Sequence, residues 1–257
     1  MKQAKKFISN NYVVITLGIL FVFALWTIIS YSDGAGNFIF PNIGDTFTSL
    51  GKLLSDKYTY ESLGWTMFRT FLGFIISFVL ALILGLFVGI FKKWQNFFKP
   101  LVIILKCVPT AAFVYLFLAK AGSRFAPNFI VSLIAFPILY EAVVRGMNSL
   151  DNDINDALRV DTNNNLYVLF KIRLPLAFPY IALGLASSFA LSVKTEIMAE
   201  IIAGDTNYGI GCMIKAIRTT SPEDMAPVFA LSSIAVIIVL LISLISSILE
   251  KKLGKDL

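Results

Sequence analysis

Long apolar runs separated by short polar stretches dominate the sequence. Each run is long enough for a helix to cross the hydrocarbon core of a bilayer, and the pattern therefore predicts an all-α polytopic membrane protein with about six transmembrane helices. The predicted spans cover residues 12–31, 63–91, 101–119, 129–146, 175–203 (beginning at Pro175 or Pro179) and 226–249.

Shorter features lie between and within these runs. After Asp45, the apolar residues 47, 50, 53 and 54 share one face, which predicts a short helix on the membrane surface. Gly85 and Gly89 form a small-residue face that permits close helix contact. Pro109 falls inside the third predicted span, where it predicts either a simple kink or a bend that lines a pathway. Residues 204–218 are interpreted as a glycine-rich loop.

Composition supports a membrane protein and restricts its chemistry. The chain is 57% hydrophobic, and its mean hydropathy is +0.79. Its formal charge of +6 is interpreted as cationic flanks beside spanning helices, not as a nucleic-acid surface. With no histidine and two distant cysteines, Cys107 and Cys212, it offers no histidine base, zinc site or disulfide framework.

The distribution of basic residues predicts the orientation. With both termini in the cytoplasm, thirteen basic residues lie inside and seven outside, which agrees with the rule that positive charge favours the cytoplasmic side. The inside set is residues 2, 5, 6, 92, 93, 99, 145, 159, 171, 173, 251, 252 and 255, and the outside set is residues 52, 57, 69, 120, 124, 215 and 218. We therefore predict a multi-pass protein of the plasma or inner membrane.

One long polar stretch, residues 140–180, lies between two spans. Ile154, Ala157 and Leu158 stand at helical spacing, and a second stripe begins at Leu166 and ends before Pro175. The intervening residues 161–165 contain three asparagines, which tolerate a sharp turn between helices. An apolar-faced helix pair at a membrane edge predicts docking into a groove on a partner, with a surface helix on lipid headgroups as the alternative.

This stretch resembles the cytoplasmic EAA loop of ABC importer permeases. Asp156-Ala157-Leu158 occupies the E-A-A position, Thr162 the glycine position, and Ile172-Arg173-Leu174-Pro175 the final I-x-L-P element. Residues 146–151 resemble the lead-in of the nitrate/sulfonate/taurine permease group, and residues 40–42 resemble its F-P-S-P segment. In this loop the acid is shortened, the second alanine is enlarged and the glycine is lost.

The resemblance implies a type I ABC importer permease fold (MetI-like) in one transmembrane domain, residues 1–257, with a core of about 61–250 and a coupling loop of 148–175. It also implies a second permease subunit, identical or different, two ABC ATPase subunits on the coupling loops, and an extracytoplasmic solute-binding protein. The expected solute is a small organic or anionic molecule of the sulfonate, nitrate, taurine or vitamin-precursor type. No phosphate-loop motif is present in the sequence, so the chain is predicted to be a transport subunit without enzyme activity or cofactor, with ATP bound by the partner subunit.

Few ionisable residues fall within the predicted spans: Lys106, Glu141, Lys194, Glu196 and Glu200. A charge there costs roughly 2.5–3.5 kcal/mol on insertion scales, so it usually faces a cavity or a partner. Glu196 and Glu200 share a helix face that excludes Lys194, and Ala199-Glu200 resembles an Ala-Glu pair of the permease group. For Glu200 we favour a structural salt bridge over a role in gating or substrate contact. Together with Pro109, residues 194, 196 and 200 are the candidates for the translocation path.

Two alternatives remain open from the sequence. A stand-alone secondary transporter or channel would use Lys194 and the two glutamates for ion coupling, and predicts an inverted repeat, of which no clear sign is found. A membrane scaffold without transport predicts no buried charge.

Overall fold

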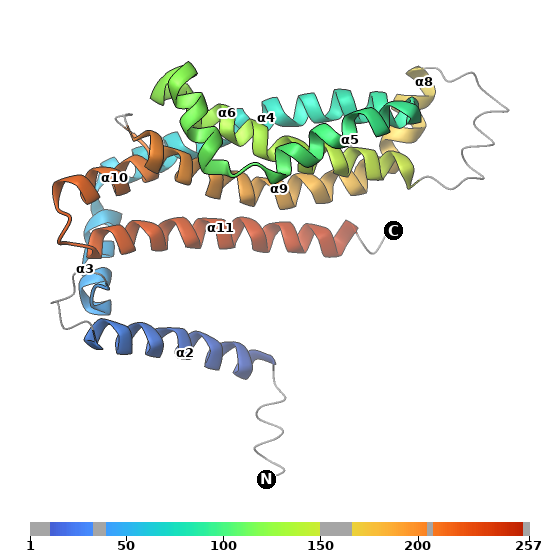
Figure 1. Ribbon diagram of the computed structural model, residues 1–257. Helices are drawn as coiled ribbons and strands as arrows, with labels where there is room; N and C mark the ends of the chain where they lie inside the picture. Colours follow the sequence, from blue (N-terminus) through green and yellow to red (C-terminus); the bar gives the residue numbers. More distant parts are fainter. Residues whose placement is uncertain (1–10, 33–39, 150–165, 205–207, 254–257) are drawn as a thin grey trace, which may run out of the picture.

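Figure 1 shows the chain as a computed structural model, which describes residues 11–32, 40–149, 166–204 and 208–253. All regular structure in these ranges is helical, as predicted. The helices are α2 (Asn11–Ser32), α3 (Ile43–Ser55), α4 (Lys57–Ile90), α5 (Lys92–Cys107), α6 (Thr110–Asn148), α8 (Leu166–Val168), the π-helical turn η1 (Leu169–Arg173), α9 (Leu174–Ala203), α10 (Ile210–Thr220) and α11 (Ala226–Leu253).

Five helical segments of the described chain are long and apolar enough to cross a membrane. They are Val13–Ser32, Lys57–Ile90, Thr110–Asn148, Leu169–Ala203 and Ala226–Ile248. Figure 1 shows α4, α6 and α9 packed together, with α11 alongside and α2 further out. The side chains of α2 are mostly exposed, as expected of a helix that faces lipid.

The third predicted span differs from the structure, in which it is divided. Helix α5 ends at Cys107, Val108 and Pro109 are extended (ψ 129° and 127°), and α6 begins at Thr110. Proline has no backbone N–H and disfavours helical geometry in the residue before it, which explains the break. The loop expected at residues 120–128 is instead part of α6, interrupted only at Gly122 (φ 71°, ψ 169°).

Glycines bring the three central helices into close contact. A Cβ atom added at Gly85 would lie 2.6 Å from Val143 Cγ1, and one at Gly89 would lie 2.7 Å from Met147 Cβ, so the close contact expected of this α4 face is confirmed. Between α6 and α9, a Cβ atom at Gly146 would lie 2.8 Å from the Ala177 carbonyl oxygen, and one at Gly184 would overlap the Ala142 methyl group.

The Gly184 contact gives a stability prediction. We expect Gly184→Ala to lower the free energy of unfolding by about 1–3 kcal/mol, because α6 and α9 must separate to admit the methyl group. The measurement is unfolding of the purified protein in mixed detergent micelles. Gly64→Ala is the matched control: no atom lies within 4 Å of its added Cβ, so it should be neutral or stabilising. Equal destabilisation by both changes would contradict this packing.

Residues 210–220, predicted as part of a glycine-rich loop, form helix α10 instead. Ile210, Met213 and Ile214 are buried against α9 and α11, with Ile217 packed beside them. These positions follow the i, i+3, i+4, i+7 spacing of an amphipathic helix. The prediction was wrong because the preceding glycines were given more weight than this stripe. A short helix is present where one was predicted after Asp45, as α3, and its place on the membrane surface stays a prediction.

Candidate functional site

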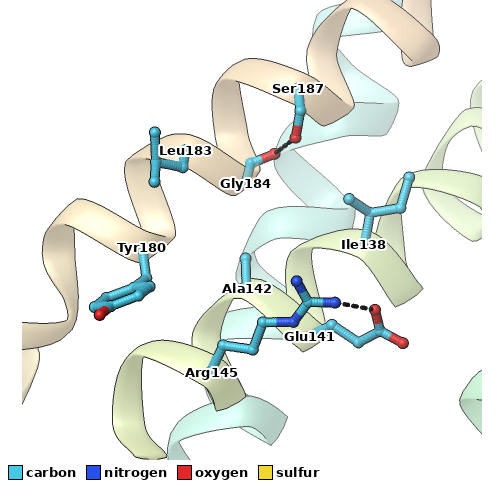
Figure 2. Close-up of a pocket in the computed structure, with 8 residues that line it drawn as sticks. All are labelled: Ile138, Glu141, Ala142, Arg145, Tyr180, Leu183, Gly184 and Ser187. Atoms are coloured by element: carbon cyan, nitrogen blue, oxygen red, sulfur yellow. Dashed lines mark hydrogen bonds and ion pairs between the residues drawn. The ribbon is translucent and has the colours of Figure 1, made fainter. Parts of the chain in front are cut away.

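A cavity of about 380 Å³ lies between α6 and α9, toward the end of the bundle where α6 stops and α9 starts. Figure 2 shows the residues that line it. Helix α6 contributes Ile138, Glu141, Ala142 and Arg145, and α9 contributes Tyr180, Leu183, Gly184 and Ser187. Ala142 and Gly184 face each other at the point of closest approach, and the larger side chains stand around this contact.

Three charged groups meet at one edge of this cavity. Lys106, in the last turn of α5, places its Nζ atom 2.6 Å from Oε1 of Glu141. Arg145, one turn further along α6, places Nη2 3.4 Å from Oε2 of the same carboxylate. The Glu141 carboxylate therefore contacts two cations, and the three side chains together carry a formal charge of +1. Sequence reasoning placed both Glu141 and Lys106 within predicted spans but did not pair them.

A second polar cluster lies where the first half of α4 meets the end of α9. It centres on Glu200, whose side chain is fully buried. Its carboxylate accepts hydrogen bonds from the Thr66 hydroxyl (2.9 Å to Oε2), from Nη1 of Arg69 (2.9 Å) and from the Gly211 backbone N–H (3.0 Å). The Thr66 hydroxyl in turn accepts from the Ile210 N–H at 2.9 Å. Glu200 and Thr66 thus satisfy two of the backbone donors left open at the start of α10.

Two glycines give Glu200 the room that it needs. Gly209 has φ 145°, and a Cβ atom there would lie 2.6 Å from Oε1 of Glu200. A Cβ atom at Gly211 would overlap the Ile197 carbonyl oxygen and lie 2.6 Å from the Glu200 Cβ. Only glycine allows both the backbone geometry and this close approach. The glycines that suggested a loop therefore position α10 over a buried carboxylate.

Glu196 lies one turn before Glu200 and is also fully buried, yet neither of its carboxylate oxygens has a hydrogen-bond partner among the described residues. Lys194 is exposed and lies off the face that these two acids share, as the helical spacing predicted. Glu200 therefore makes the salt bridge favoured from the sequence, whereas a role in the translocation path stays a prediction for Pro109, Lys194, Glu196 and Glu200.

The two acids should respond differently to neutralisation. We expect Glu196→Gln to leave the yield of folded protein unchanged, because no described donor loses a partner. Glu200→Gln should lower it, because hydrogen bonds to a charged group contribute about 1.5–3 kcal/mol each. The measurement is the monodisperse fraction on size-exclusion chromatography, with uptake assayed in parallel. An equal loss for both variants would contradict the contrast between them.

Most of the predicted coupling residues lie outside the described ranges: Ile154, Asp156, Ala157, Leu158 and Thr162. Leu166 begins α8, while Leu174 and Pro175 open α9 and fit the proline preference for a first helical turn. Pro109 lies at the break between α5 and α6.

Sequence reasoning did not find Thr66 and Arg69 as partners of Glu200, and it counted Arg69 among the outside basic residues. A usable signal was present in the same helix. Buried hydroxyl residues recur every three or four positions along one face of α4 at residues 59, 62, 66 and 70, and again two turns later at residue 77. Such a stripe on an otherwise apolar spanning helix predicts a polar partner inside the bundle.

Residues 73–256 match the family described as "Binding-protein-dependent transport system inner membrane component". The chain belongs to this family and is thus an ABC importer permease subunit, a transport component of the inner membrane. It is 25% identical over 235 residues to the putative aliphatic sulfonates transport permease protein SsuC of Bacillus subtilis (strain 168), covering 91% of this chain and 84% of SsuC.

Other relatives differ in length and in the solutes that their names give. The glycine betaine/proline betaine permease protein ProW of Escherichia coli (strain K12) is 27% identical over 161 residues, which are 62% of this chain but only 42% of ProW. The nitrate import permease protein NrtB of Leptolyngbya laminosa is 30% identical over 112 residues, 43% of this chain and 40% of NrtB.

Solved structures support the fold predicted from the sequence. A chain of the MetNI methionine ABC transporter in an inward-facing conformation superposes with a TM-score of 0.64 at 16% identity, covering 76% of this chain and 96% of that one. An amino acid ABC transporter crystallised with histidines gives 0.60 at 17% identity, covering 80% and 95%. At these identities the likeness extends to the fold alone.

Proposed function

We propose that this subunit, together with a second permease subunit, encloses the path of a small organic or anionic solute into the cell. In this proposal, separate ATPase subunits supply the energy and an extracytoplasmic binding protein delivers the solute. The observation that carries the proposal is the family match over residues 73–256. It argues against a stand-alone secondary transporter, in which coupling would depend on the buried acids of α9.

Coupling is assigned to residues 148–175. Their sequence resembles an EAA loop, and this segment leads directly into α9, the helix that lines both polar clusters. ATP-driven closure of the ATPase pair would move the loop and, through Leu174 and Pro175, tilt α9. Such a rigid-body movement is a common way of transmitting a change at one site to another.

The proposed orientation places both termini and this loop in the cytoplasm. Support comes from the excess of basic residues on that side. It also comes from Figure 1, where the starts of α2 and α9 and the ends of α4, α6 and α11 lie toward one end of the bundle. The cavity between α6 and α9 would then lie in the cytoplasmic half of the membrane.

The solute class is inferred from the names of relatives. Aliphatic sulfonates, nitrate and glycine betaine are small, and each carries a negatively charged oxygen group. These names describe the relatives, and they favour the same class of solute here.

The test is to search the reading frames adjacent to this gene for a phosphate-loop ATPase, to co-express that ATPase with the chain, and to reconstitute the complex in liposomes. We expect the ATPase to co-purify stably with the chain. We also expect solute uptake only when ATP is enclosed in the liposome lumen, the compartment that corresponds to the cytoplasm. Uptake by the chain alone, driven by a sodium or proton gradient, would instead support the secondary transporter.

A further inference from the structure

We propose that the cavity between α6 and α9 binds the anionic group of the solute, with Arg145 as the residue that anchors it. This inference rests on the proposed function, since it assigns a binding site and a ligand class to the permease. The cavity volume, about 380 Å³, falls in the range of small-molecule sites, and the cavity joins charged groups to apolar walls.

At the cavity edge, the Glu141 carboxylate lies closer to one of its two cationic neighbours than to the other. Glu141 is held by Lys106 at 2.6 Å, whereas its contact with Arg145 is 3.4 Å long. That contact is the single hydrogen bond of the Arg145 side chain among the described residues. A guanidinium group has five N–H donors, so most of those on Arg145 are available to a ligand. Lys106 therefore neutralises the carboxylate, and Arg145 supplies the excess positive charge.

The geometry of arginine selects the kind of group that binds. Its planar fork presents two parallel N–H donors, which match the oxygen pairs of a carboxylate or sulfonate. Figure 2 shows the Arg145 side chain running along α6 toward Glu141 and past Ala142, the residue that packs closely against Gly184 of α9. Three-quarters of the Arg145 side chain is exposed, so it is accessible to a solute.

Helix α9 completes the site with one polar group and two apolar ones. The Ser187 hydroxyl donates to the Gly184 carbonyl at 3.2 Å, a long bond that a better acceptor would replace. The Tyr180 ring and Leu183, with Ile138 opposite on α6, give the organic part of a ligand an apolar wall. A cation is disfavoured, because it would have to displace Lys106 from Glu141.

The test uses the purified permease–ATPase complex in lipid nanodiscs, with radiolabelled ethanesulfonate, nitrate and acetate as probes and tetramethylammonium as the cationic comparison. We expect at least one anion to bind saturably at constant ionic strength, and tetramethylammonium not to bind. Arg145→Met should weaken anion binding at least about tenfold, because it removes a charge-assisted contact, while Arg145→Lys should retain part of it.

Glu141→Gln should act in the opposite direction. It removes the negative charge and leaves Lys106 and Arg145 both facing the cavity, so we expect anion binding to tighten several-fold. Lys99→Met is the matched control, since Lys99 is an exposed lysine of α5 that does not line the cavity. Binding to this variant should equal that of the wild type.

Three results would overturn the proposal: no binding of any anion to the wild type, unchanged binding by Arg145→Met, or weaker binding by Glu141→Gln. A fourth is dissociation of paired permease subunits by Arg145→Met, measured by light scattering, which would make the cavity a contact between copies. ATPase co-purification is scored in every preparation. Its absence from the wild type would count against the proposed function, whereas anion binding by the permease alone would still support the site.

Discussion

Replacing Arg69 with Met is expected to lower the free energy of unfolding by about 3–5 kcal/mol. The side chain of Arg69 is 11% exposed and that of Glu200 is 0% exposed, so the substitution leaves a buried carboxylate without its cationic partner. It also removes the hydrogen bond of 2.8 Å from Nη1 of Arg69 to the Tyr208 carbonyl oxygen. The measurement is equilibrium unfolding in detergent micelles, followed by tryptophan fluorescence.

Two further variants separate loss of the charge pair from loss of side-chain packing. The double variant Arg69→Met/Glu200→Gln should recover a large part of the stability, because the stranded charge is gone. Arg124→Met is the matched control for an exposed arginine and should have little effect. If Arg69→Met unfolds like the wild type, the ion pair does not hold the first half of α4 to the end of α9.

Replacing Ala157 with Glu is expected to abolish co-purification of the ATPase and, with it, solute uptake. Ala157 stands on the predicted apolar face of the coupling loop with Ile154 and Leu158, and a glutamate there would bury an unpaired charge in the contact. A penalty of several kcal/mol weakens binding more than about a hundredfold. The permease itself should express and insert normally, because Ala157 lies outside the predicted spans.

The control for this variant is Asn155→Glu, which places the same acid on a position outside the apolar stripe. It should retain the ATPase. If Ala157→Glu also retains the ATPase and supports normal uptake, residues 148–175 do not couple the permease to its energy source.

The long apolar runs predicted the spanning helices well, because their signal is local and strong. Pro109 was recognised as a disturbance, but composition alone does not distinguish a kink from a complete break, and the structure has a break. Helix α10 was missed because Gly209 and Gly211 suggested a loop. These glycines make room for the side chain of Glu200, which belongs to a different helix, α9.

The polar clusters were predicted only in part, for a related reason. Single acids such as Glu196 and Glu200 stand out within an apolar run, but their partners do not. Arg69 lies 131 residues from Glu200 in the sequence, and Lys106 lies 35 residues from Glu141. Which of these residues meet is decided by how α4, α5, α6 and α9 pack, and periodicity within one helix carries no information about that.

The break at Val108 and Pro109 also affects how the bundle can move. The Val108 N–H closes the last turn of α5 on the Ile104 carbonyl, and the Pro109 carbonyl accepts the first bond of the next helix, from Ala112. Neither of these bonds links α5 to α6 across the break, so a change in the angle between the two helices breaks no turn of either. The break is therefore a joint between helices α5 and α6, and Lys106 of the Lys106–Glu141 pair lies within one turn of it.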